Sequence, residues 1–167
     1  LSLDAPVGGE LADLQILEGF DATGAAQFST ARYSPTLRQL LAHTAGFAYP
    51  WNHPLLSRYG ALDRPFLIHV PGTRWYYRIN IDWVGRFVEA ASGQTLEAYF
   101  QEHILQPLGM SETSFLLPPE KLPRLARNYQ RDDDGTLRLQ PRVQPPPPAF
   151  FNGGGGLFST APDYVRF

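Results

Sequence analysis

Three groups of residues in this sequence are of types that could do chemistry: an aromatic cluster, a glycine run and four histidines. Trp75, Tyr76 and Tyr77 follow a Pro-Gly turn, and Gly153 to Gly156 are four consecutive glycines. Aromatic side chains can wall a ligand pocket, and glycines let a ligand or another segment approach the backbone closely. The residues alone therefore offer two possible pocket walls and a tyrosine, but no complete catalytic set.

The common nucleophile and metal motifs are missing. Lys121 is the only lysine, so no Ser-x-x-Lys exists, and no serine lies in a Gly-x-Ser-x-Gly elbow. The absence of cysteine excludes thiolate nucleophiles, disulfides and thiolate metal sites. The four histidines are far apart in sequence, and none has the spacing of HExxH. We therefore predict no metal site.

Three other features favour structural roles. His43 follows Leu40 and Leu41 where a helix should end, so its imidazole is expected to bond to the last carbonyls or to a loop. The acids at 132–134 lack the spaced ligands of a calcium loop and predict a hairpin tip. The glycines at 153–156 lack the Gly-Lys-Ser/Thr ending of a phosphate loop, which favours close backbone packing or a pocket wall.

The aromatic cluster precedes the clearest helix of the chain. Apolar residues recur on one face from Ile79 to Ala91, and Gly93 stands where a glycine would end the helix. A helix is also predicted from Ser34 as N-cap and Pro35, with Leu37, Leu40 and Leu41 buried, and one from Thr95. Thr160 and Asp163 have the spacing of a capping box for a last helix. The aromatics should therefore lie at the mouth of a helix.

The strand signals are weak. Thr113 to Leu116 and Ala126 to Gln130 are short candidates for strands, and residues 1–33 show no defensible period. The proline run at 145–148 should be extended. We therefore predict a mainly α chain with short strands.

Composition excludes several classes of partner. The chain has 167 residues, 43% of them hydrophobic, and a formal net charge of −2. That charge gives no reason to expect nucleic acid or an anionic membrane as partner. No apolar run approaches the roughly 18 residues of a membrane span. The missing initiator Met, and a final helix with only about two turns after its cap, lead us to expect an interior piece of a longer protein.

Three blocks in this order resemble one known family. The blocks are LRQLLAHTAGF at 37–47, the run from Pro71 to Phe115, and GGGGLFSTAPDYVRF at 153–167. Together they are similar to the serine β-lactamase-related family of class C β-lactamases, D-Ala-D-Ala carboxypeptidases, family VIII carboxylesterases and fungal statin acyltransferases. The resemblance implies the helical-domain portion of the α+β β-lactamase/transpeptidase-like fold. It implies one partial domain over 1–167, a helical subdomain with a glycine-rich return segment at 152–167.

The resemblance also implies a mechanism. In the family a Ser-x-x-Lys supplies the nucleophile, and a tyrosine completes the base system. Tyr77 matches that tyrosine, because the string from Tyr77 to Gly85 is similar to the esterase-type pattern Tyr-Ser-Leu-Ala-Leu-Asp-Val-Leu-Gly. A phenol near a lysine ammonium can have its pKa lowered and relay the serine proton. No metal or organic cofactor is implied, because lysine and tyrosine do the proton work.

Two positions depart from the family pattern. Ile79 stands where the lactamase-type motif has Asn, which favours an esterase or acyltransferase of small esters over a β-lactamase or D,D-peptidase. Arg78 replaces a small residue, which keeps open a non-catalytic binding module on the same scaffold. Without the nucleophile motif, these 167 residues alone are expected to be inactive.

Further residues are candidates for lining an acyl pocket, with ordinary core packing as the alternative. The expected partners are a small ester or lactam substrate and the remainder of the parent chain; the compartment is left open. The candidate lining residues are Trp51, Trp75, Tyr76, Phe150, Phe151, Gly154 and Gly155.

Overall fold

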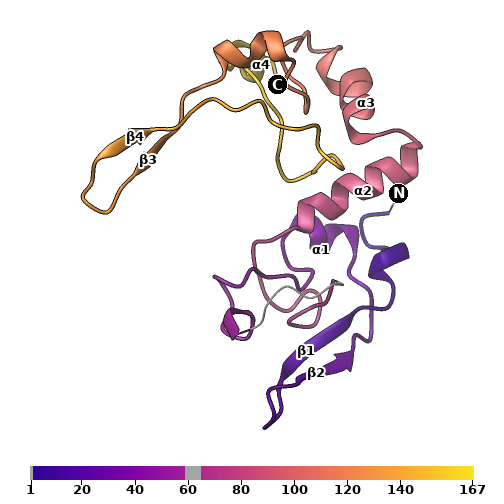
Figure 1. Cartoon of the computed structure of the whole chain (residues 1–167). Helices are drawn as coiled ribbons and strands as arrows, with labels where there is room; N and C mark the ends of the chain where they lie inside the picture. The colour runs from indigo at the N-terminus through magenta and orange to yellow at the C-terminus, as the bar shows by residue number, and fades with distance from the viewer. Residues whose placement is uncertain (1, 59–64) are drawn as a thin grey trace. The chain divides into compact units, whose positions relative to one another are not determined.

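The chain folds into two compact units, each described here by itself. The first comprises Leu1–Gly93 and Asn152–Gly155, and the second Gln94–Phe151 and Gly156–Phe167. The structure is a computed structural model that describes residues 2–58 and 65–167 (Figure 1). Helix accounts for 28% and strand for 14%, so helix outweighs strand although more than half of the chain is turn or loop.

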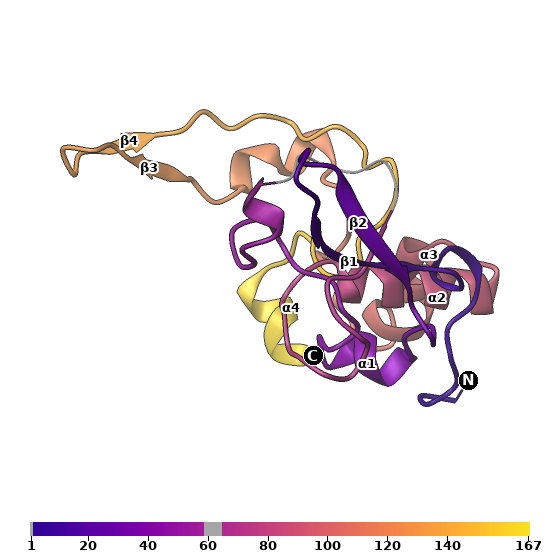
Figure 2. The same cartoon turned by 90° about the horizontal axis from the view of Figure 1, so that it is seen from below.

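Among its described residues, the first unit contains a two-stranded hairpin and two α-helices. Its elements are η1 (Gly9–Leu11), β1 (Gln15–Phe20), β2 (Ala26–Thr30), α1 (Leu37–Leu41), η2 (Leu56–Arg58) and α2 (Asn80–Ser92). β1 and β2 run antiparallel, and their pairing is evident in both orientations (Figures 1 and 2). The sequence prediction missed this hairpin.

The missed hairpin has a physical explanation. Ile16 belongs to one buried cluster together with Leu40, Phe47 and Trp83. The next residue, Leu17, belongs to a second buried cluster. Successive side chains of a strand point to opposite faces. β1 is therefore buried on both faces, and such a strand lacks the alternation of apolar and polar residues that would reveal it.

α2 matches its prediction, whereas α1 does not in detail. Gly93 ends α2 at φ 70° in the left-handed region, where a glycine pays no steric penalty. The N-cap of α1 is Thr36 with a capping box to Gln39, and the predicted N-cap, Ser34, instead donates to the Ala12 carbonyl at 2.6 Å. Leu41, predicted to be buried, is 47% exposed. α1 contributes Leu40 to the buried cluster and Leu37 packs against the same cluster, so the buried face of this helix does not include Leu41.

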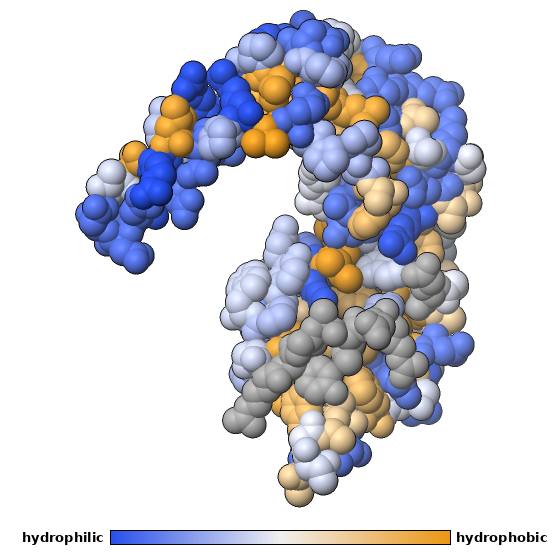
Figure 3. Space-filling view, in the orientation of Figure 1, coloured by the Kyte–Doolittle hydropathy of each residue, from blue (hydrophilic) through white to orange (hydrophobic). Residues whose placement is uncertain are grey.

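The second unit is held together by short elements. They are α3 (Leu96–Phe100), the π-helical turn η3 (Gln101–Leu105), η4 (Pro119–Arg124), β3 (Tyr129–Arg131), β4 (Leu137–Leu139) and α4 (Ala161–Arg166). Thr95 caps α3 and Thr160 caps α4, as the sequence predicts. β3 and β4 form the hairpin whose tip the acids at 132–134 predict. Its residues are exposed, and its surface is largely hydrophilic (Figure 3).

Candidate functional site

Tyr77 lies at the entrance to α2 with its side chain partly open to solvent. Its side chain is 47% exposed. The ring packs against the imidazole of His43 with centroids 4.7 Å apart, and against the ring of Tyr49 at 6.4 Å. Its backbone carbonyl accepts a hydrogen bond from the Asn52 amide at 3.0 Å. The phenol is therefore held by ring contacts and its backbone while remaining accessible.

Two loop segments that are hydrogen-bonded to each other fix the position of this tyrosine. Ile68 N donates to the Gly46 carbonyl at 2.8 Å, and Tyr76 N donates to the His43 carbonyl at 3.0 Å. A side chain at Gly46 would meet the His69 carbonyl at 2.7 Å, so only glycine allows this approach. The segment after α1 and the segment before α2 therefore run together and bring His43 to Tyr77, 34 positions later.

A polar pair, His43 and the buried Asn80, lies beside the tyrosine. Asn80, in the first turn of α2, is fully buried, and its Nδ2 lies 3.1 Å from His43 Nδ1 and 3.4 Å from the Tyr76 carbonyl. Burial lowers the pKa of His43, so the imidazole is neutral at pH 7. Sequence reasoning gave His43 a structural role and missed Asn80. The one signal for Asn80 in the sequence is its position, three residues after Tyr77 at the start of the same helix.

The rings of His43, Tyr49, Trp51, Trp75 and Tyr77 contact one another and are called the aromatic group below. Its two tryptophans, both predicted pocket residues, are its most exposed members. Trp75 is 62% exposed and meets the His43 ring edge-on at 6.1 Å. Trp51 is 75% exposed and stacks on Tyr49 at 5.5 Å. Both therefore adjoin rings that contact Tyr77, and they form an open aromatic wall around it.

Tyr76 points into the interior of the first unit. It packs against the second buried cluster, between the rings of His53 at 5.1 Å and His69 at 5.7 Å. Burial lowers the pKa of both histidines, and the positive charge of Arg74 adds to this effect. Tyr76 thus anchors the loop before α2, which also carries its neighbour Tyr77.

Arg78 is folded back onto an aromatic ring. Its guanidinium lies over the Tyr49 ring at 5.7 Å, and burial lowers its pKa. Its buried Nε has no hydrogen-bond partner among the described residues. A guanidinium on an aromatic face is a favourable cation–π arrangement. Arg78 is therefore partly buried and packs on the ring of Tyr49, which itself contacts Tyr77.

The glycine run serves backbone packing at one position above all. A side chain at Gly153 would lie 2.3 Å from the Ile81 carbonyl and 2.9 Å from Gly85 N of α2. Gly154 N donates to Asp82 Oδ1 at 2.9 Å, whereas a side chain at Gly155 would meet nothing within 4 Å. The residue that most requires glycine is thus Gly153, beside the two predicted positions.

Phe150 and Phe151, the remaining predicted pocket residues, belong to the second unit. Phe151 is partly buried and packs on Phe115 at 5.3 Å, and Phe150 is 49% exposed. Within the second unit Phe151 is therefore a core residue. Phe150 lies at the surface of that unit.

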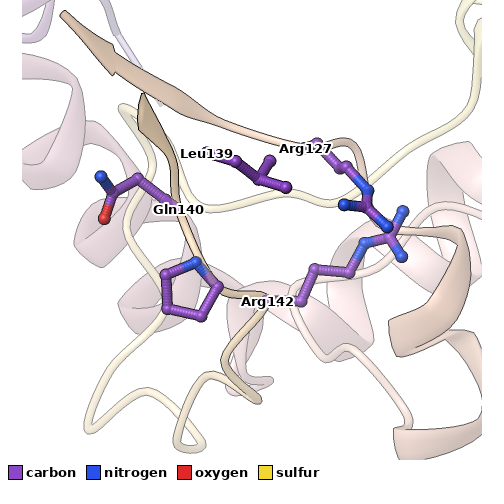
Figure 4. Close-up of a pocket in the computed structure, with 5 residues that line it drawn as sticks. Arg127, Leu139, Gln140 and Arg142 are labelled. Atoms are coloured by element: carbon purple, nitrogen blue, oxygen red, sulfur yellow. The ribbon is translucent and has the colours of Figure 1, made fainter. Parts of the chain in front are cut away.

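The second unit also has a hollow of its own, of about 400 Å³, at the base of the β3–β4 hairpin. Arg127 and Arg142 extend toward each other across it, with Leu139 and Gln140 beside them (Figure 4). Arg142 Nε donates to the Leu125 carbonyl at 2.8 Å. The hollow contains no acid and no nucleophilic side chain, which sets it apart from the aromatic group of the first unit.

The described residues contain no group of three or more His, Cys, Asp or Glu side chains that could hold a metal ion. In the same part of the chain, no helix is long and apolar enough to cross a membrane. The chemistry available at the aromatic group is therefore that of a phenol, a neutral imidazole and a buried amide.

Comparison with known proteins places this geometry in a family. A family model described as Beta-lactamase matches residues 1–167. Monacolin J acid methylbutanoyltransferase of Aspergillus terreus is 39% identical over 163 residues, which cover 86% of this chain and 40% of that protein. Lovastatin esterase of Penicillium rubens is 31% identical over 133 residues, 69% of this chain and 33% of that protein. The chain thus spans well under half the length of these relatives.

Solved structures show the same similarity. A mutant of simvastatin synthase from Aspergillus terreus superimposes with a TM-score of 0.87 at 37% identity, covering 99% of this chain and 44% of that one. A penicillin-binding protein homologue from Pyrococcus abyssi, at 22% identity, has a TM-score of 0.63 over 99% of this chain and 38% of that one, and speaks for the fold alone. The fold is therefore β-lactamase/transpeptidase-like.

Proposed function

The chain belongs to the beta-lactamase family, and from this membership we propose that it is part of a serine hydrolase that acts on small esters through an acyl-serine intermediate. Relatives named for transferring a methylbutanoyl group and for cleaving an ester support this proposal. The observation that carries it is the position of Tyr77, whose half-exposed ring stands at the entrance of α2 within an aromatic wall. The finer fold assignment, the helical portion of the family's domain with residues 152–167 as its return segment, is part of the same proposal.

The proposed chemistry has two balanced steps. In the first, the serine oxygen attacks the ester carbonyl, the serine proton passes to the tyrosine–lysine base system, and the alcohol leaves with a proton. In the second, water or another alcohol attacks the acyl-serine ester, and the serine regains its proton. Water makes the protein an esterase and an alcohol makes it an acyltransferase. The serine and its lysine are proposed to come from sequence outside residues 1–167, which hold no Ser-x-x-Lys.

The residues around Tyr77 have separate proposed parts. Tyr77 relays the proton, and Trp51 and Trp75 line the acyl pocket on the exposed side of the group. Gly154 and Gly155 are the remaining proposed lining residues of the first unit. The proposed partners are a small ester and the remainder of the parent chain.

The test uses the complete protein with p-nitrophenyl butyrate and a fluorophosphonate that labels reactive serines. We expect one labelled serine, and Tyr77→Phe should lower kcat by about 10²- to 10⁴-fold, the usual contribution of a proton-transfer group. Tyr129→Phe is the matched control, because Tyr129 is 56% exposed on the β3–β4 hairpin. Equal turnover of the two variants would exclude Tyr77 from the chemistry, and an unlabelled protein without turnover would favour a non-catalytic binding module.

A lactam substrate distinguishes the proposed esterase or acyltransferase from the second candidate, a β-lactamase or D,D-peptidase. Ile79 occupies the position of the amide that the lactamase-type motif carries, so hydrolysis of nitrocefin should be much slower than turnover of the ester. Faster turnover of nitrocefin would favour a β-lactamase or D,D-peptidase.

A further inference from the structure

We propose that His43 is a positioning residue, locked by Asn80 in one tautomer, that fixes the ring of Tyr77 for proton transfer. The inference rests on the proposed function for its kinetic consequence, but its structural part concerns only contacts within the first unit. Four features of His43 support it: its backbone conformation, the direction of its hydrogen bond, its ring contacts and its distance in sequence from Tyr77.

The backbone of His43 adopts an uncommon conformation. Among the described residues it is the one non-glycine residue with positive φ, at 55°. Few non-glycine residues adopt the left-handed region. Here it is held at both sides, since His43 N donates to the Leu40 carbonyl at 3.1 Å and the His43 carbonyl accepts from Tyr76 N at 3.0 Å. A conformation of this kind persists where the surrounding structure needs the side chain in one direction.

The tautomer follows from the partners of Asn80. The Nδ2 group of Asn80 faces both His43 Nδ1 and the Tyr76 carbonyl. A carbonyl can only accept, so the amide end on this side is the donor. His43 Nδ1 therefore accepts, and the single proton of the neutral ring is on Nε2. The other end of the amide, Oδ1, is buried and has no hydrogen-bond partner among the described residues. The Asn80 amide is therefore held by its donor contacts alone.

The locked imidazole forms the packing surface for the tyrosine. Its ring centroid lies 4.7 Å from that of Tyr77, at an interplanar angle of 38°, and 6.1 Å from that of Trp75. A protonated imidazole would turn its Nδ1–H toward the Asn80 donor, and the hydrogen bond would be lost. Neutral His43 thus keeps one edge on Asn80 and its side against Tyr77. A displacement of a catalytic group by about 1 Å can lower the reaction rate roughly 10²-fold.

The central variant is His43→Asn. Asparagine is among the residues that tolerate the left-handed region, so the backbone can remain while the ring contact disappears. In the complete protein we expect kcat to fall roughly 10- to 100-fold while KM changes little, because positioning affects the reacting geometry more than substrate binding. An unchanged kcat would overturn the proposal.

A matched histidine–tyrosine pair provides the control. In the second unit the ring of His103 packs on Tyr99 with centroids 4.4 Å apart. His103→Asn removes an equivalent ring contact away from the aromatic group, and should leave kcat and KM unchanged. If both variants lose activity equally, the effect of His43→Asn is one of general stability and the proposal fails.

A measurement without kinetics separates this inference from the proposed function. The ¹⁵N resonances of His43 in the complete, unmutated protein distinguish a proton on Nε2 from one on Nδ1, and we expect the Nε2–H form at pH 7. The aromatic ¹³C resonances of Tyr77 should shift in His43→Asn and not in His103→Asn. An Nδ1–H form or unmoved Tyr77 resonances would overturn the positioning role even in an active enzyme. The expected spectra in a protein without turnover would support the packing while the proposed function failed.

Discussion

The two units differ in how completely the polar atoms of a buried side chain are hydrogen-bonded. In the second unit the carboxylate of Asp163 is 2% exposed, and both of its oxygens are used: Oδ2 accepts from Glu112 N and Thr113 Oγ1, and Oδ1 from Arg166. In the first unit Asn80 is also fully buried, yet its Oδ1 has no hydrogen-bond partner among the described residues. A fully bonded group is what stability requires, and an incompletely bonded one points to a role beyond stability.

Glu97 repeats the pattern of the second unit. Its Oε1 accepts from Gln101 and Ser114 Oγ, and its Oε2 accepts from Phe115 N at 2.8 Å. Glu97, in the first turn of α3, thus joins this helix to the segment at 114–115. The carboxylates of Asp163 and Glu97 therefore connect backbone segments, whereas the first unit places a neutral imidazole and a buried amide beside a half-exposed tyrosine.

The largest effect that would test this comparison is expected from Asp163→Ala. It leaves the Glu112 N–H and the Thr113 hydroxyl without their acceptor, which should lower the free energy of unfolding by about 3 kcal/mol. Urea unfolding measures the change. The control is Asp133→Ala at the hairpin tip, which should change stability by less than about 0.5 kcal/mol. A similarly small change in Asp163→Ala would mean that the bonding of this carboxylate is not what holds the second unit together.

A smaller loss of stability, about 2 kcal/mol, is expected from Gly153→Ala in the first unit. Its new methyl group would press on the Ile81 carbonyl and on Gly85 N of α2. Gly155→Ala is the matched control two residues later, where a side chain meets nothing within 4 Å. Thermal unfolding of the two variants should differ clearly, and equal midpoints would exclude close packing as the reason for the first glycine.

The smallest expected effect is a difference in the response of the two units to acid. In the first unit burial lowers the pKa of His43, His53 and His69. The unfolded chain, with histidine pKa values of about 6.5, then binds more protons than the folded one. The stability that these neutral histidines contribute above that pH is therefore lost as the pH falls below it. In the second unit the hydrogen bond from Arg124 lowers the pKa of Glu112. The stability that this carboxylate contributes is therefore lost only when the pH falls below the ordinary pKa of a carboxyl group.

Hydrogen exchange between pH 7 and pH 5, corrected for the intrinsic pH dependence of exchange, measures this difference. Amides of the first unit should lose protection by a few-fold over this interval, while those around Glu112 should keep theirs. Loss of protection in both units over the same interval would show that the buried histidines do not set the acid response.

Local signals in the sequence predicted the caps of α2, α3 and α4 but not the N-cap of α1, and they predicted long-range contacts poorly. Thr160 and Asp163 show both outcomes in one motif. Thr160 Oγ1 accepts from Asp163 N at 3.3 Å, as the spacing predicts. The Asp163 side chain, however, reaches Glu112 and Thr113, which lie 51 and 50 positions earlier. A cap depends on neighbours within one turn, whereas this carboxylate depends on how distant segments meet.

The candidate site was predictable to the same extent. Family resemblance and the helix entrance predicted Tyr77 as a candidate residue, and Trp75 lies two positions before it in the chain. Trp51, by contrast, joins the same group through its contact with Tyr49. The contact with His43 was not predictable, since it arises where Gly46 lets two loops run together. β1 was missed because burial on both faces removes the alternation that sequence reasoning needs.

The glycine segment also has a consequence for how the chain acquires its structure during synthesis. The bond from Gly154 N to Asp82 spans 72 positions, with most of the second unit lying between its two ends. A ribosome that has made α2 must still make that whole insertion before the segment that packs on the helix exists. The first unit therefore cannot be completed in order of translation, and its last contacts form only after a long loop has closed.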